Sequence, residues 1–165
     1  MRIVLAVDFS APSEVAVSEV VARPWPPGTV VHVLHILDLF ALTSSVGYFD
    51  TFISKQAEEA GALARSIAKR LQSSGLETKT EIIEGYPGAG ISDYARKVNA
   101  DFIFVGSHGH SGIVRLLLGS VAKLVVQNAG CSVEIVRAST GRHAGRRPRG
   151  ACRGMEKQEA MKCKR

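Results

Sequence analysis

The feature that most constrains this chain is a regular alternation between short apolar runs and longer amphipathic stretches. Continuous apolar runs of about five residues are typical of strands that are buried on both faces of a sheet. A run that alternates polar and apolar residues is typical of an edge strand instead. We expect four buried strands at Ile3–Val7, Val30–Ile36, Ile103–Val105 and Val133–Val136, of which the second is interrupted by His32 and His35 and the fourth contains Glu134. We expect one edge strand at Lys79–Ile83.

Amphipathic stretches with apolar residues at steps of three and four separate these runs and predict helices. Ser10 is a suitable N-cap for the first helix, because its side chain can accept a hydrogen bond from a free backbone N–H. Gly75 is a suitable C-terminal stop for the longest helix. The expected helices cover about residues 10–22, 51–74, 90–99 and 120–129.

The order of these elements predicts an α/β fold with a single open, five-stranded parallel sheet and helices on both faces. Strands that are separated by helices cannot pair as hairpins, so they pair in parallel. The result is a Rossmann-like three-layer sandwich. Sheets of this kind bind ligands beyond the carboxyl ends of their strands, where the strand order reverses. The first positions to consider are therefore Asp8, Gly85 and Gly106.

Charge divides the chain into two parts. The net charge is +6, but nine of the 21 basic residues and only two of the 15 acidic ones lie at 138–165. Residues 1–137, the predicted domain, therefore carry twelve basic and thirteen acidic residues. The tail at 138–165 is rich in Gly and Arg and poor in large apolar residues, so we expect it to be disordered. It is either a solvated extension or a weak contact for a polyanion.

Three cysteines, an odd and sparse set, do not form a disulfide framework and favour a reducing, cytoplasmic setting. No apolar run approaches the roughly 18 residues of a membrane span, so we expect no contact with a membrane.

Glycines are concentrated after the fourth predicted strand, in the pattern Gly106-x2-Gly109-x9-Gly119-Ser120. Gly106, Gly109 and Gly112 permit backbone with φ > 0 and a close approach of a ligand to the main chain. Gly119-Ser120 opens the last helix, whose free N–H groups and dipole favour an anion. The pattern predicts a phosphate site that needs no charged side chain.

This pattern matches the nucleotide-binding signature of the universal stress protein family, and the resemblance extends over residues 1–137. The opening Ile3–Ser10, the stretch Asn99–Gly109 and the stretch Leu116–Val121 are all similar to segments of that family. The resemblance implies a fold of the adenine-nucleotide alpha-hydrolase type and a protein that binds ATP and acts in a stress response or in regulation.

The resemblance also implies roles for single residues. Asp8 would contact the ribose or the adenine, and backbone at Ala6, Val7 and Ile36 would flank the base. The backbone N–H groups of Gly119, Ser120 and Val121, together with the Ser120 hydroxyl, would bind the phosphates. A Mg²⁺ ion would be held through those phosphates. The implied binding site comprises Ala6, Val7, Asp8, Ile36, Val105, Gly106, His108, Gly109, Gly119, Ser120 and Val121.

In this family the last strand commonly pairs with its copy in a homodimer, which here implies pairing through Val133–Val136. Glu134 departs from the aliphatic residue that is usual at its position, although a glutamate on an edge strand can face water.

Other motifs fail at a defining residue. The segment from Gly85 to Ser92 is spaced like a phosphate-binding P-loop but has Ile91 at the position of the required lysine.

Two further functions stay open. One is slow ATP hydrolysis, with His108 as the only nearby candidate base and no residue assigned as catalytic. The other is a dimeric interaction module that binds no nucleotide.

Overall fold

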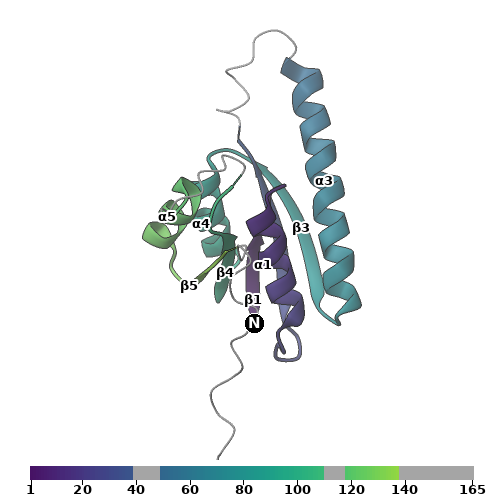
Figure 1. Cartoon of the computed structure of the whole chain (residues 1–165), viewed down its shortest axis with the longest axis vertical. Helices are drawn as coiled ribbons and strands as arrows, with labels where there is room; N and C mark the ends of the chain where they lie inside the picture. Colours follow the sequence, from purple (N-terminus) through teal and green to yellow (C-terminus); the bar gives the residue numbers. More distant parts are fainter. Residues whose placement is uncertain (39–48, 110–117, 138–165) are drawn as a thin grey trace, which may run out of the picture.

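Five parallel strands form one sheet, and helices cover both of its faces (Figure 1). The structure is a computed structural model that describes residues 1–38, 49–109 and 118–137. The predicted α/β class is confirmed, whereas the tail at 138–165 lies outside the described residues. The strands are β1 (Arg2–Ala6), β2 (Val30–Leu37), β3 (Glu77–Glu84), β4 (Phe102–Gly106) and β5 (Ser132–Val136), and the helices are α1 (Ala11–Ala22), α3 (Phe49–Ser73), α4 (Pro87–Lys97) and α5 (Ser120–Asn128).

The strand order is β3-β2-β1-β4-β5, which places β1 in the middle of the sheet. Ile3 pairs with Val31 of β2 on one side and with Phe102 of β4 on the other. From β1 the chain builds outward through β2 and β3, and it then crosses to the other side for β4 and β5. The order therefore reverses between β1 and β4, and this is the place where open α/β sheets bind ligands.

Two apolar clusters, one on each face of the sheet, account for the continuous apolar run of β1. Successive side chains of a strand point to opposite faces. Ile3 and Leu5 accordingly pack in the cluster that includes residues of α1 and α3, and Val4 packs in the cluster that includes residues of α4 and α5. All three are 0% exposed, because helices cover both faces.

The two edge strands are protected by charged side chains. On β3, Lys79 and Glu81 are exposed, as expected for an edge. On β5, Glu134 does not simply face water. It accepts hydrogen bonds from both terminal nitrogens of Arg23, just beyond α1, and the guanidinium lies 5.2 Å from the centre of the Phe104 ring. These hydrogen bonds raise the pKa of Arg23 above its ordinary value.

The residues that were expected to begin and end the helices largely do so. The Ser10 hydroxyl accepts a hydrogen bond from the N–H of Ser13 at 3.3 Å and caps α1. Gly75, after α3, has φ of +83°, a conformation that favours glycine. The helix expected from Gly90 begins three residues earlier, because Pro87 occupies a first-turn position where proline is tolerated.

A buried polar pair joins β2 to α4. The Nδ1 atom of His32 lies 2.9 Å from the hydroxyl of Tyr94, and the two side chains are almost fully buried. Burial lowers the pKa of His32 and raises the pKa of Tyr94 to about 12. Both groups are therefore uncharged at neutral pH, which suits a hydrogen bond inside the core.

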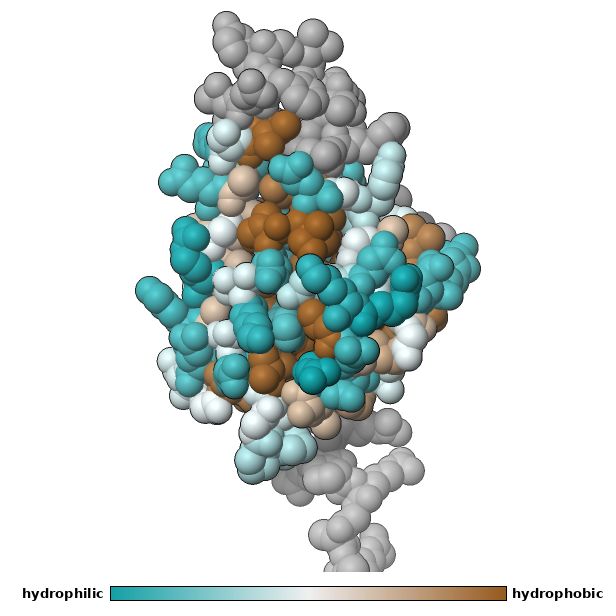
Figure 2. All heavy atoms as spheres, turned by 180° about the vertical axis from the view of Figure 1, so that it is seen from behind, coloured by the Kyte–Doolittle hydropathy of each residue, from teal (hydrophilic) through white to brown (hydrophobic). Residues whose placement is uncertain are grey.

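The face opposite to that of Figure 1 carries apolar side chains near its centre, between polar margins (Figure 2). Over the described part of the chain, no helix combines the length and the apolar character that crossing a membrane requires.

Candidate functional site

A pocket opens beyond the carboxyl ends of β1 and β4, where the strand order reverses. The space inside it, counted out to the open solvent, is about 500 Å³. The predicted residues that line it are Ala6, Val7, Asp8, Ile36, Val105, Gly106, His108, Gly109 and Val121.

The remaining two predicted residues lie beside this lining. Gly119 is the N-cap of α5, and its N–H donates to the carbonyl of Ser107 at 2.9 Å, next to the lining residue His108. Ser120 is the first residue of α5 and is exposed. The fold thus brings the turn after β4 and the start of α5 together, although ten residues separate Gly109 from Ser120 in the chain. Gly112, the third glycine of the predicted turn, lies outside the described residues.

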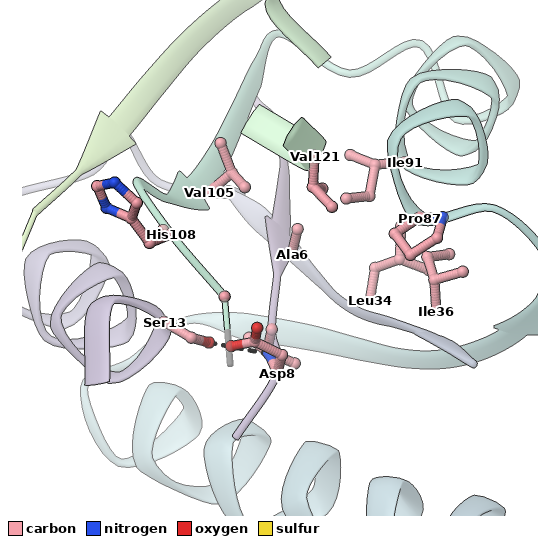
Figure 3. Close-up of a pocket in the computed structure, with 13 residues that line it drawn as sticks. Ala6, Asp8, Ser13, Leu34, Ile36, Pro87, Ile91, Val105, His108 and Val121 are labelled. Atoms are coloured by element: carbon pink, nitrogen blue, oxygen red, sulfur yellow. Dashed lines mark hydrogen bonds between the residues drawn. The ribbon is translucent and has the colours of Figure 1, made fainter. Parts of the chain in front are cut away.

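The pocket has two unlike walls (Figure 3). Aliphatic side chains of Leu34, Ile36 and Ile91 gather on one side, around Pro87. On the other side lie the carboxylate of Asp8 and the hydroxyl of Ser13. Such a cavity can hold a molecule with a flat apolar part and a polar part, because each part meets a wall of its own kind.

Asp8 is held in a defined orientation by the turn between β1 and α1. Its Oδ1 atom accepts a hydrogen bond from the N–H of Ser10 at 3.0 Å and another from the Ser10 hydroxyl at 2.5 Å. Its own N–H donates to the hydroxyl of Ser13 at 3.0 Å. Asp8 therefore orders the turn and also lines the pocket.

The glycines at the pocket are required by close contact rather than by backbone angle. Neither Gly106 nor Gly109 has a positive φ, so that part of the expectation was wrong. A β-carbon on Gly106 would lie 3.0 Å from the backbone of Pro12 and Ser13. A β-carbon on Gly109 would lie 3.0 Å from Oδ2 of Asp8. The turn after β4 thus packs directly on the start of α1.

The start of α5 has no side-chain cap. Its first intrahelical hydrogen bond runs from the N–H of Lys123 to the carbonyl of Gly119 at 2.9 Å. The N–H groups of Ser120 and Val121 therefore have no acceptor within the helix. The N–H of Gly119 was expected among the phosphate donors, but here it binds the carbonyl of Ser107. An anion at the N-terminus of α5 would therefore be bound by the N–H of Ser120 and of the residues that follow it, and not by the N–H of Gly119.

His108 is placed as a turn residue. Its Nδ1 atom lies 3.1 Å from the hydroxyl of Ser107, and its ring points away from the centre of the pocket (Figure 3). The candidate base His108 therefore does not direct its ring into the centre of the pocket.

Four lining residues were missed by the sequence analysis: Ser13, Leu34, Pro87 and Ile91. Pro87 and Ile91 belong to the segment that fails as a P-loop, and they supply part of the apolar wall. Their position was accessible in principle, because α4 follows the carboxyl end of β3 and such segments surround the ligand in parallel sheets. Ser13 and Leu34 belong to no motif, and only their closeness in sequence to Ser10 and Ile36 could have indicated them.

The electrostatic character of the pocket comes from backbone and from one acid. The lining residues of the described chain include Asp8 and no lysine or arginine. Within the described ranges, no cluster of three or more His, Cys, Asp or Glu residues is arranged to hold a metal ion. Recognition of an anion here would depend on N–H groups and on the dipole of α5.

Comparisons with known proteins agree with this geometry. Universal stress protein MJ0531 of Methanocaldococcus jannaschii is 32% identical over 109 residues, which cover 65% of this chain and 64% of that protein. Universal stress protein MJ0577 of the same organism is 29% identical over 152 residues and is covered to 94%. The solved structure of MJ0577 superposes with a TM-score of 0.79 over 84% of this chain and 96% of the other.

A third relative was solved with a ligand. The universal stress protein of Archaeoglobus fulgidus, in complex with dAMP, is 28% identical and superposes with a TM-score of 0.56 over 82% of this chain and 97% of the other. The sequence model of the universal stress protein family matches residues 1–137, which include every strand of the sheet and every residue of the pocket. The chain belongs to the universal stress protein family.

Proposed function

We propose that this protein binds an adenine nucleotide, ATP in the first place, and that nucleotide occupancy regulates its part in a stress response. One observation carries the proposal: the pocket at the reversal of strand order combines an aliphatic wall with the turn glycines and the start of α5. These are the surfaces that a planar base and a chain of phosphates require.

The aliphatic wall supports the site of the base. Ile36, Ile91 and Val121 approach from β2, α4 and α5, so a flat ring between them would be buried on several sides (Figure 3). We place the adenine there, with backbone at Ala6 and Val7 along its edge. Asp8, at the polar side, is placed to accept hydrogen bonds from ribose hydroxyls, since a carboxylate accepts and does not donate.

The start of α5 supports the site of the phosphates. The N–H groups of Ser120 and Val121 and the Ser120 hydroxyl are donors at a helix N-terminus, which attracts an anion. The absence of basic side chains from the described lining favours backbone recognition. A Mg²⁺ ion would be held mainly by phosphate oxygens, because Asp8 is the only carboxylate in the described lining.

The relative from Archaeoglobus fulgidus supports the choice of adenine, because it was solved with dAMP at 28% identity to this chain. ATP is our proposal for the physiological ligand. Because ATP is abundant in the cytoplasm, we propose that the protein acts in that compartment.

The proposal is tested by denaturing freshly purified protein and identifying any released nucleotide by mass spectrometry. Calorimetric titration of nucleotide-free protein with ATP and Mg²⁺, and separately with GTP, follows. We expect an adenine nucleotide in the first experiment and preferential ATP binding in the second. Absence of a released nucleotide together with absence of heat on titration would reject the proposal and leave an interaction module.

We also propose a homodimer that pairs through β5, the edge strand next to β4. The Arg23–Glu134 pair is compatible with this arrangement, because the charge of Glu134 is paired with Arg23 on one face of the sheet, and the backbone edge of β5 is where a second copy would pair. Light scattering during size-exclusion chromatography should report twice the 17.7 kDa chain mass. A monomer across the accessible concentration range would contradict the dimer.

A further inference from the structure

The peptide group between Val7 and Asp8 is held at both of its ends. The carbonyl oxygen of Val7 accepts a hydrogen bond from Nδ1 of His35 at 2.8 Å. The N–H of Asp8 donates to the hydroxyl of Ser13 at 3.0 Å. Because a peptide group is planar, these two bonds together determine how the whole plane is oriented.

The bond from His35 lies just beyond the regular pairing of β1 with β2. That pairing ends at Ala6 and Leu34, and the N–H of Val7 still donates to the carbonyl of Leu34 at 2.8 Å. The next contact to the turn is made by a side chain, that of His35. The chain leaves the sheet here, so the hydrogen bond to the carbonyl of Val7 comes from the side chain of His35 and not from a backbone N–H of β2.

The imidazole of His35 is itself well fixed. It is 9% exposed, and the ring of Phe9 packs edge-on against it with centroids 5.9 Å apart. A carbonyl oxygen only accepts hydrogen bonds, so the contact with Val7 requires the proton on Nδ1. A buried donor that is directed at the carbonyl oxygen of Val7 suits a positioning role.

The orientation of the Val7–Asp8 peptide matters because both residues line the pocket. Rotation of this peptide plane changes φ of Asp8 and therefore moves its carboxylate. The Oδ2 atom of Asp8 lies 3.0 Å from the place where a β-carbon on Gly109 would stand, so this carboxylate lies directly beside the turn after β4.

We propose that His35 is a positioning residue of the nucleotide site: it orients the Val7–Asp8 peptide and thereby the carboxylate of Asp8 toward the ligand. The inference rests on the proposed nucleotide binding and adds to it a residue that lies outside the pocket lining. His35 is connected to the pocket through the carbonyl oxygen of Val7, a residue that lines it.

Two substitutions at His35 separate the hydrogen bond from the filling of space. His35→Leu removes the donor and fills the space with an apolar side chain. His35→Asn keeps an N–H donor at the same number of bonds from the backbone as Nδ1. We expect His35→Leu to weaken ATP binding at least about tenfold and His35→Asn to stay within about threefold of the wild type, because only the first loses the donor that holds the wall in place.

His32→Leu is the matched control. His32 lies on the same strand and is also buried, but its Nδ1 atom contacts the hydroxyl of Tyr94 of α4 and not the turn. We expect His32→Leu to lower the melting temperature as His35→Leu does and to leave the ATP dissociation constant unchanged. Equal losses of affinity in His35→Leu and His35→Asn, or unchanged affinity in His35→Leu, would overturn the proposal.

A readout without ligand keeps this inference separate from the proposed function. Amide hydrogen exchange of Asp8 and Ser10, followed by NMR in nucleotide-free protein, reports how firmly the turn is held. His35→Leu should speed this exchange at least about tenfold and His35→Asn much less. If the wild type binds no nucleotide but the exchange responds in this way, the proposed function fails, while the role of His35 in orienting the Val7–Asp8 peptide is retained. Unchanged exchange in His35→Leu overturns that role whether or not nucleotide binds.

Discussion

Gly106 and Gly119 lie where backbone atoms leave little room for a side chain. A β-carbon on Gly119 would stand 3.0 Å from the carbonyl oxygen of Ser107 and 3.3 Å from the α-carbon of His108. Backbone atoms cannot move aside as the end of a flexible side chain can. Substitution at these positions therefore acts through the turn that lines the pocket.

Gly119→Val should displace the start of α5 from the turn after β4. We expect at least about a tenfold loss of ATP affinity and a destabilisation of about 1–3 kcal/mol, typical of overpacking. Calorimetry and urea unfolding measure the two effects. Gly130→Val is the matched control, because a β-carbon there meets nothing within 4 Å and Gly130 has no positive φ. ATP affinity in Gly119→Val equal to that of the control would contradict the steric argument.

At the scale of elements, the start of α1 connects helix stability to the pocket. The Ser10 hydroxyl caps the helix through the N–H of Ser13 and also donates to Asp8 at 2.5 Å. Ser10→Ala should cost about 1 kcal/mol of stability, the usual effect of a lost N-cap, and should also weaken ATP binding.

Ser18→Ala is the control for this change. Ser18 lies on the same helix, and its exposed hydroxyl bonds only the carbonyl of Glu14, one turn back. Urea unfolding and calorimetry on both variants decide the matter. If Ser10→Ala lost stability but bound ATP normally, Asp8 would not depend on the cap.

The contact between β2 and α4 predicts a dependence of stability on pH. Burial, assisted by the positive charge of Lys79 and of Arg2, lowers the pKa of His32 in the folded protein, while Glu81 and Glu77 act in the opposite direction. The unfolded state therefore binds the proton more readily than the folded state does. The contribution of neutral His32 to stability is complete above the unfolded pKa, about 6.5, and is lost as the pH falls through the lower folded value.

His32→Asn should reduce this dependence, because Asn does not titrate in this range and still offers Tyr94 a hydrogen-bond partner. Urea unfolding at about pH 7.5, 6.5 and 5.5 measures the slopes. We expect a smaller loss of stability on acidification in His32→Asn than in the wild type. Parallel slopes would indicate that His32 takes no part in the pH response.

At the scale of the whole molecule, the net positive charge belongs to residues 138–165 of the sequence and not to the residues that line the pocket. Residues 138–165 contain nine basic and two acidic residues, so a chain that ends at Arg137 would change from net +6 to net −1. We expect the full chain to bind heparin at low salt, with a steep decrease as salt rises, and the shortened chain to pass through the column. ATP affinity should be the same in both. Equal heparin retention would place the polyanion contact on the domain instead.

Much of the fold follows from local pattern. The continuous apolar run of β1 predicts a strand that is covered on both faces, and Ile3, Val4 and Leu5 are indeed fully buried. Gly75 marks the end of α3 because its left-handed conformation favours glycine. The start of α4 was misplaced by three residues, since proline in a first turn and proline in a loop look the same in a sequence.

The candidate site could be predicted from the sequence only in part. The sequence alone determined that glycines and a serine at the right spacing follow the fourth strand and open the last helix, because turn chemistry and helix starts are local properties. Only the tertiary structure decided that Gly106 must be small for its contact with α1, that Ile91 completes an aliphatic wall, and that His35 reaches the carbonyl of Val7. These facts depend on distances between segments far apart in the chain, and such distances exist only once the sheet brings the segments together.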